Sequence, residues 1–505
     1  MRTYFQSPRG TNAILTSLRL IAPAALASIF ALAGCTVGPN YKKPDATVPA
    51  KWDVEQPWRE SAPKDAFDKG EWWKVFNDDE LNTFETQAIA ENQTIKISIA
   101  HLEQARATAA IQVSTLFPTL SSGAGVERQR LSGNRPPNSP IPITGPYQQN
   151  TFQIPFTVNY ELDIFGKRRR SIEAAEAAYQ ANAADLQNVR LLIESQIAGA
   201  YFNLRQLDSE IGILRRTVDA LQKGLDLVNS RHNGGVASGL DVAQEETLLD
   251  TTRTQATLML QQRKQFEDAL AVLVNRGAPD FHIAPRELTG EPPPLNAGLP
   301  SDLLERRPDI AESERLMASA NAQIGVAQAA YYPSFNLFGQ AGWQSADITK
   351  IASIQSIFWA VGANAAEDIF TGGARRAQVQ YARAGWDASV ASYRQTVLAA
   401  FQEVQDELTA LNVLSEAQQE QQQAVDAARR ALDISTSRYQ GGLINYLDVV
   451  TAQQNLLQNQ QQAAVIQGQR LVASVLLVKA LGGGWDASSL AIVQVKPQRR
   501  DIITP

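Results

Sequence analysis

Few residues of this chain could carry covalent or metal chemistry. The 505 residues include one cysteine, Cys35, so no disulfide can form within the chain. The histidines, His101, His232 and His282, lie far apart and have no second histidine or cysteine nearby, which argues against a metal site. We find no glycine-rich phosphate loop and no nucleophile motif. The sequence therefore predicts no enzyme and no cofactor. The formal net charge of −6 also argues against a nucleic-acid partner.

The cysteine stands at the end of an N-terminal leader. Residues 1–34 contain three arginines and no acidic residue, and the run 20–33 is almost wholly apolar. About 14 apolar residues are too few to cross a bilayer and are typical of a secretory signal. Leu-Ala-Gly before Cys35 resembles the lipobox of bacterial lipoproteins, which implies a signal peptide at 1–34 and a covalent lipid on Cys35. The alternative is a buried structural cysteine. Residues 35–70 are rich in proline and are predicted to be extended.

The rest of the chain contains an internal duplication. Residues 230–242 (SRHNGGVASGLDV) match 437–449 (SRYQGGLINYLDV) without a gap, and 7 of 13 positions are identical. Other matching segments follow in the same order. We therefore predict one structural unit written twice, over 71–280 and 281–485, with a C-terminal tail at 486–505.

Each unit is predicted to contain a long helical hairpin. From Ile197 to Val228, apolar residues recur every seven positions in two rows, the pattern of a coiled coil. The second copy keeps one row, but its other row is polar. No proline interrupts 166–230, and some 65 helical residues would extend about 100 Å. Gly-Gly pairs then turn the chain, which gives hairpins at about 166–275 and 372–481.

Four further segments alternate between apolar and polar residues and predict amphipathic strands. Segments of about ten residues with one apolar face suit a transmembrane barrel, although an ordinary half-buried sheet is the alternative. Four strands cannot close a barrel, and an open edge in lipid leaves backbone groups unpaired. We therefore predict an α+β membrane protein whose strands complete a barrel shared by several copies. The strands lie at about 119–130, 150–163, 334–345 and 356–369.

Three segments carry a resemblance to a known family: 298–310 (GLPSDLLERRPDI) with its continuation to 334, 160–166 (YELDIFG) and 479–485 (KALGGGW). In them the chain resembles the outer membrane factors, the lipoprotein branch of the TolC family that serves resistance-nodulation-division (RND) efflux pumps. The resemblance implies a homotrimer with a 12-stranded barrel, a periplasmic coiled-coil tunnel of roughly 100 Å and a mixed α/β equatorial belt.

The same resemblance implies a function and partners. The protein would be a passive exit duct for small molecules such as drugs, lipid-anchored in the cell outer membrane. It would dock to a periplasmic adaptor (membrane fusion protein) and an inner-membrane RND transporter. The alternatives are a duct for a type I protein or polysaccharide exporter, and a structural coiled-coil lipoprotein.

The resemblance also implies a gate at the periplasmic ends of the hairpins. Asp448 matches an aperture aspartate of TolC-like proteins, and Asp241 is its counterpart in the first copy. Tyr439 matches a tyrosine of the same polar network, and Arg438 precedes it. The alternative for both aspartates is helix capping, because a carboxylate is favourable at a helix N-terminus.

This chain departs from its relatives at the gate. Ile444 stands where a linking arginine is found, and Thr451 stands where a second ring of aspartates is usual. An apolar plug at Leu447 could therefore close the aperture in place of polar links.

The Gly-Gly loops, Gly234-Gly235 and Gly441-Gly442, are predicted to contact the adaptor, because glycine permits close approach of a partner helix. The alternative is that they only form tight turns.

Overall fold

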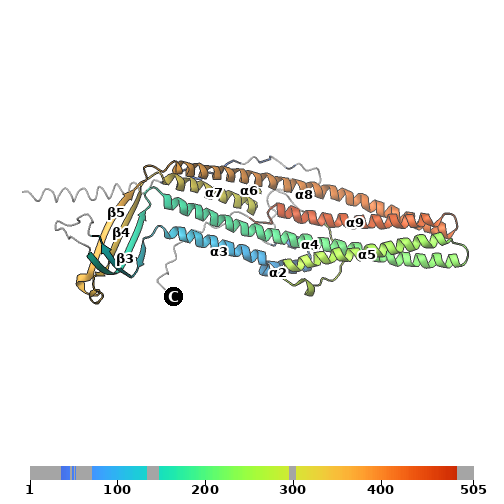
Figure 1. Cartoon of the computed structure of the whole chain (residues 1–505). Coiled ribbons are helices and arrows are strands. Elements are labelled where there is room, and N and C mark those ends of the chain that lie inside the picture. Colours follow the sequence, from blue (N-terminus) through green and yellow to red (C-terminus); the bar gives the residue numbers. More distant parts are fainter. Residues whose placement is uncertain are drawn as a thin grey trace, which may run out of the picture.

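The protein is elongated, with a sheet at one end and helices along the rest of its length (Figure 1). The computed structural model describes residues 36–45, 48–49, 52, 71–132, 147–294 and 303–485. The predicted signal peptide, Cys35, most of the extended segment and the tail at 486–505 lie outside the described residues.

The helices occur in two matched sets. Each set contains helices of 22, 67 and 35 residues in the same order, as a duplication predicts. At 1.5 Å per residue, the 67-residue helices are about 100 Å long. The first set is α3 (Gln93–Ser114), α4 (Lys167–Asn233) and α5 (Gly239–Leu273), and the second is α7 (Pro308–Ala329), α8 (Ala374–Gln440) and α9 (Tyr446–Ala480). The shorter helices are η1 (Trp72–Phe76), α2 (Asp79–Glu91), η2 (Ala278–Asp280), α6 (Leu303–Arg306), η4 (Ile348–Lys350) and η5 (Ile354–Ser356).

The heptad rows of α4 lie in the core of the helical part, together with residues of α5, α8 and α9. Ile197, Leu204, Leu214 and Val228 are fully buried, and burying such a side chain contributes about 1.5–3 kcal/mol. The second copy buries fewer side chains at its tip, as its polar row predicts. Helix α9 is long and apolar enough to cross a bilayer, but most of its apolar stretch is buried in this core.

Within each set, the 22- and 35-residue helices lie end to end beside the 67-residue helix (Figure 1). Asn92 caps α3 by accepting from Thr94 N (2.8 Å), and it donates to the Leu273 carbonyl at the end of α5 (2.7 Å). Arg307 occupies the equivalent place before α7 and donates to the Ala480 carbonyl at the end of α9 (3.1 Å). The two copies therefore make the same junction with different side chains.

The linker between the copies, described over residues 281–294, is bound along α4 and α5. Arg263 donates to the Ile283 carbonyl (2.7 Å), and Arg205 donates to the Ala284 carbonyl (2.8 Å). Buried Asp208 lies between the two guanidinium groups, at 2.8 Å and 2.6 Å. The resemblance implies an equatorial belt with residues near 71–95, 285–300 and 480–495, and no strand occurs in the described part of these ranges.

The sheet is antiparallel, with the strand order β1-β3-β4-β5 and with β2 also paired to β3. Its first predicted strand, 119–130, is interrupted at 123–124, although both parts keep one register on β3. The last predicted strand ends at Ala366 rather than near 369, because its partner β4 begins at Ser334, which lies opposite Ala366. The strands are β1 (Thr119–Ser122), β2 (Gly125–Leu131), β3 (Tyr147–Leu162), β4 (Ser334–Ser345) and β5 (Ile357–Ala366).

One face of this sheet is apolar and uncovered. Ile154 lies opposite Trp343, which lies opposite Ile357, so apolar side chains form continuous rows across the strands. Trp359 and Val361 of β5 are 73% and 75% exposed. An exposed apolar face of this extent is unfavourable in water and is rare on monomeric soluble proteins. The described chain is therefore built to meet lipid or further strands.

Arg307→Ala is predicted to weaken the second junction. The Arg307 side chain is buried and also contacts Asp309 (2.7 Å) and Glu403 (2.9 Å). Its loss removes the ion pairs to both carboxylates and leaves the Ala480 carbonyl without its side-chain donor, so we expect a loss of about 2–4 kcal/mol in the free energy of unfolding. Guanidinium unfolding in detergent, followed by helical circular dichroism, measures this. Arg429→Ala, at an exposed position on α8, is the control. Equal loss in both variants would contradict the prediction.

Candidate functional site: the hairpin tips

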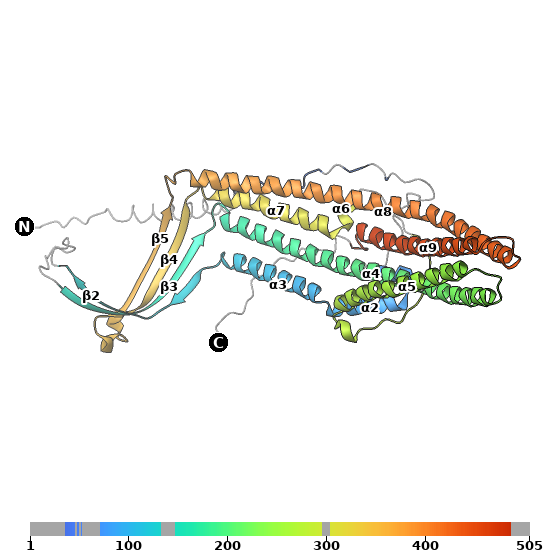
Figure 2. The same cartoon turned by 45° about the vertical axis from the view of Figure 1, so that its right-hand side comes forward.

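The two hairpin tips lie side by side at the end of the molecule opposite the sheet (Figures 1 and 2). The second glycine of each loop has positive φ, +76° at Gly235 and +71° at Gly442, a conformation that favours glycine. Gly234 and Gly441 have φ of −80° and −79°, which any residue can adopt. The two loops therefore have the same backbone, and only one glycine of each pair is required by it.

A cation–π contact joins the two tips within one chain. The rings of Tyr439 and Tyr446 lie 4.8 Å apart, and the guanidinium of Arg231 lies 4.9 Å above the Tyr439 ring. A cation in this position contributes roughly 0.5–1 kcal/mol. The Tyr439 hydroxyl has no hydrogen-bond partner among the described residues. Tyr439 therefore packs against Arg231 and α9, and Arg438, predicted beside it in the polar network, is exposed.

The two predicted gate aspartates differ in their contacts. Asp241 forms a capping box with Ser238: its backbone N–H donates to the Ser238 hydroxyl (3.2 Å), and its carboxylate accepts from Ser238 N (3.0 Å). This is the capping alternative considered for Asp241. Asp448 is exposed and makes no side-chain hydrogen bond or ion pair with any described residue, and Asn445 before α9 gives no side-chain cap. Asp448 is therefore the predicted gate aspartate whose carboxylate has no partner among the described residues, and the gate role of both residues stays a prediction.

Exposed apolar side chains repeat at both tips. Val236 is 70% exposed and its counterpart Leu443 is 76% exposed, while Leu240 and its counterpart Leu447 are 66% and 54% exposed. Ile444 is half-buried against the tip cluster. The predicted plug residue Leu447 is therefore one of four apolar side chains displayed at the end of the tube.

Sequence reasoning missed a buried carboxyl behind the tips. Glu245 of α5 is fully buried, and it fits there because Gly224 of α4 has no side chain. Tyr446 and Gln453 of α9 lie beside it, but neither carboxylate oxygen has a hydrogen bond of good geometry among the described residues. Burial raises the pKa of the Glu245 carboxyl, and its neighbours offset this only in part. A glycine within a heptad helix was the one available signal.

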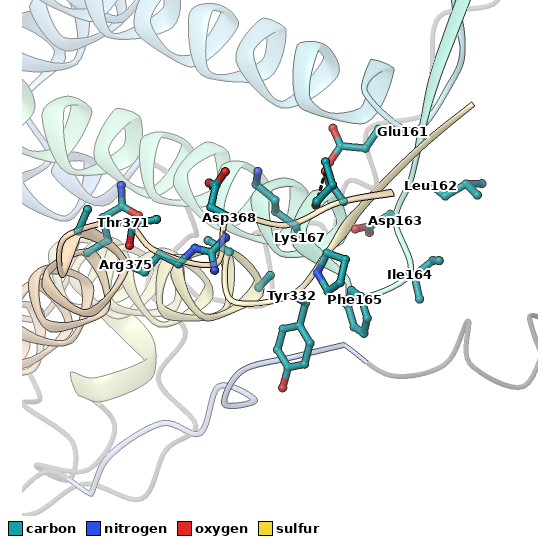
Figure 3. Close-up of a pocket in the computed structure, with 17 residues that line it drawn as sticks. Glu161, Leu162, Asp163, Ile164, Phe165, Lys167, Tyr332, Asp368, Thr371 and Arg375 are labelled. Carbon is teal, nitrogen blue, oxygen red and sulfur yellow. Dashed lines mark hydrogen bonds and ion pairs between the residues drawn. The ribbon is translucent and has the colours of Figure 1, made fainter. Parts of the chain in front are cut away.

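A pocket of about 400 Å³ lies at the opposite end, where strands become helices (Figure 3). Asp163 caps α4 by accepting from Arg168 N and Arg169 N, both at 2.9 Å. Phe165 stacks on Tyr332 with ring centroids 4.5 Å apart. The Asp163 carboxylate therefore stabilises the corner between β3 and α4. Among the described residues, no group of His, Cys, Asp or Glu side chains could hold a metal ion.

An uncovered apolar sheet, joined to helical hairpins of about 100 Å, defines a membrane-embedded duct. The outer membrane efflux protein family matches the chain twice, over residues 86–276 and 299–483, once in each copy. The chain belongs to this family, and its location is the outer membrane.

Known relatives match nearly the whole chain. It is 33% identical to the toluene efflux pump outer membrane protein TtgF of Pseudomonas putida, over 92% of this chain and 96% of TtgF. It is 32% identical to the pyoverdine export outer membrane protein OpmQ of Pseudomonas aeruginosa, over 90% of this chain and 95% of OpmQ. The solved structure of the outer-membrane channel OprN is similar with a TM-score of 0.83 and 28% identity, covering 89% of this chain and 100% of that one.

Asp448→Ala is predicted to raise single-channel conductance or to reduce block by cations. Several copies of this unpaired carboxylate near one axis would repel each other and attract cations. Planar-bilayer recordings of the purified channel measure both properties. Asp241→Ala is the matched control in the other copy: it should cost roughly 0.3–1.5 kcal/mol of stability through the lost hydrogen bond from Ser238 N and leave conductance unchanged. Unchanged conductance and block in the Asp448 variant would remove Asp448 from the gate.

Glu245→Gln is predicted to stabilise the tips increasingly as the pH rises. The pKa of Glu245 is raised in the folded state, so its contribution is fully present below the unfolded value and is lost as the pH rises through the folded value. Glutamine at position 245 cannot ionise. The variant should therefore keep its melting temperature over the pH range in which that of the unsubstituted protein falls. Thermal unfolding in detergent from pH 5 to 8 tests this, with Glu246→Gln, at an exposed position, as the control. A difference independent of pH would show that Glu245 does not titrate in this range.

Proposed function

We propose that the protein is the outer-membrane exit duct of a tripartite efflux pump and that it acts without catalysis. The observation that supports this most is the pairing of an open apolar sheet with helical hairpins of about 100 Å in one chain. A duct makes no bonds; it needs a wall in the membrane, a tube and an end that opens. The sheet, the helices and the tips supply these parts in that order along the molecule.

The duplication supports a specific way of closing the wall. In the first copy Thr119 pairs with Asn159, and in the second copy Ser334 pairs with Ala366, so β1–β3 and β4–β5 are equivalent pairs. The β3–β4 pair then has its equivalent only between β5 of one protomer and β1–β2 of the next. In the β3–β4 pair, Phe156 lies opposite Ala341. By the same equivalence, Ala363 is the counterpart of Phe156 and Val126 is the counterpart of Ala341. Ala363 is therefore expected opposite Val126 of the neighbour. Both side chains stay on the apolar face.

Three protomers would complete a 12-stranded barrel, and this number rests on the resemblance to outer membrane factors. The partners are a periplasmic adaptor and an inner-membrane RND transporter. The exposed apolar side chains at the tips, around Gly234-Gly235 and Gly441-Gly442, fit contact with the adaptor. TtgF is named for toluene and OpmQ for pyoverdine, so similar ducts serve different cargo. The cargo of this duct is therefore a small molecule set by its pump.

The gate would close at Asp448 and Leu447, which are exposed at the tip. Asp241 and Tyr439 hold the hairpin ends in shape through a cap and an aromatic contact. Arg438, exposed on the last turn of α8, would lie near the aperture without joining it to a neighbour.

A covalent lipid on Cys35 would anchor the chain. The residues that follow are fixed near the end of the sheet, because Val37 N donates to the Phe165 carbonyl (3.1 Å). Buried Arg170 of α4 donates to the Val37 carbonyl (3.2 Å). Acyl chains on Cys35 would therefore begin at the level where the strands leave the membrane, which suits the inner leaflet of the outer membrane.

The seam is predicted to form a disulfide between Ala363→Cys of one protomer and Val126→Cys of the next. Directly opposed residues meet the requirement that Cα atoms lie within about 7 Å. Oxidation of the double variant in membranes should give covalent dimers and trimers on denaturing gels.

The control pairs Ala363→Cys with Leu120→Cys, which lies on the same strand face six residues away and should not react. Cys35 is the only native cysteine and remains in both variants. Crosslinking of the control in place of the first pair would overturn the register, and an absence of oligomers in both would overturn the shared barrel.

A further inference from the structure

The far end of the β2–β3 hairpin carries a pair of arginines on its outward face. Arg128 lies opposite Asn150 and Arg130 lies opposite Gln148. Alternation along the strand puts both on the face that includes Val126 and Phe152, which is the apolar face of the sheet. The arginines therefore continue the lipid-facing rows beyond their last apolar members.

The position of the two arginines along the membrane normal places them at the rim of the apolar band. The apolar row of β3 extends from Phe152 to Leu162, which at about 3.3 Å per residue and a tilt of about 45° spans about 23 Å of membrane. That is close to the apolar band of about 25 Å found on outer-membrane barrels. Arg128, on β2, lies one pleat beyond Phe152. Figure 2 shows β2 at the end of the sheet away from the helices. Because the helices occupy the periplasmic side, this rim belongs to the outer leaflet.

The charge of this rim is not compensated within the described chain. Arg128 donates to the neutral Gln148 side chain (3.2 Å), and neither arginine has an ion pair among the described residues. Between residues 128 and 150 the sequence contains no acidic residue, in a chain whose net charge is −6. At the end of the other hairpin, Asp347 and Lys350 balance each other. A local excess of positive charge at a membrane rim calls for an anion from outside the chain.

We propose that Arg128 and Arg130 bind the phosphate groups of a phosphorylated glycolipid of the outer leaflet, of the lipid A type. The planar guanidinium donates paired hydrogen bonds that match phosphate oxygens. Val126 and Phe152 lie below the arginines, where they can pack against acyl chains. This assignment rests on the proposed barrel with its apolar face in lipid. It adds a lipid site to each seam, because β2 is the strand that meets the neighbouring protomer.

The test measures lipid A bound to the purified full-length trimer by native mass spectrometry. The double variant Arg128→Gln/Arg130→Gln should retain about tenfold less lipid A. The control Arg429→Gln/Arg430→Gln, with two exposed charges removed from α8, should retain as much as the unsubstituted protein. Equal retention in the β2 variant and the control would overturn the proposal.

A second arm needs no variant and decides the question if the β2 variant does not assemble. The unsubstituted trimer should bind dephosphorylated lipid A about tenfold less than lipid A. Equal binding of the two lipids would overturn the phosphate site, and displacement of lipid A by an equal concentration of inorganic phosphate would overturn its assignment to lipid. The seam disulfide between positions 363 and 126 forms independently of lipid A, so its loss would indicate failure of the barrel and not of the lipid site.

Discussion

The open edges of the sheet constrain the rest of this molecule. Within the described chain, β1–β2 and β5 each have one side without a backbone partner, and the apolar face is uncovered. In water this face would aggregate, and in lipid each unpaired backbone group would cost several kcal/mol. Both penalties are removed when copies pair edge to edge and the face meets lipid. The helices follow from that closure, because strands held in a ring also hold the first residues of α4 and α8 in a ring.

Duplication lets one chain supply two equivalent sectors of such a ring, and the two copies then diverge where equivalence is not needed. The helix junctions keep one hydrogen bond in both copies, from Asn92 in the first and from Arg307 in the second. The tips keep the same glycine turn but use their aspartates differently. Asp241 is bound in a capping box, whereas Asp448 is left without a partner among the described residues. Backbone geometry is thus retained in both copies, and side-chain chemistry is divided between them.

The sequence was sufficient for the features that depend on local pattern. Heptad spacing predicted the buried rows of α4, and the Gly-Gly pairs predicted the turns at Gly235 and Gly442. The break at 123–124 was missed because ladder interruptions depend on the partner strand. Glu245 and Arg231 were missed for a similar reason: their roles arise from contacts between α4, α5, α8 and α9, and nothing in the local sequence marks a glutamate as buried. The boundaries of the repeats and the gate residues remain predictions that the fold accommodates.

The two ends of the molecule are stabilised in ways that suit different tasks. At the sheet end, the Arg170 and Asp163 contacts fix the corner between β3 and α4 with directional hydrogen bonds. At the tips, aromatic and apolar side chains pack around the Glu245 carboxyl. Burial of this carboxyl is unfavourable when it is ionised. Packing of this kind has little directional preference, so a partner helix that offers apolar contacts of its own can replace it at small net cost. A duct that must remain closed alone and open when docked needs this difference, with a rigid wall in the membrane and an end whose contacts can be exchanged.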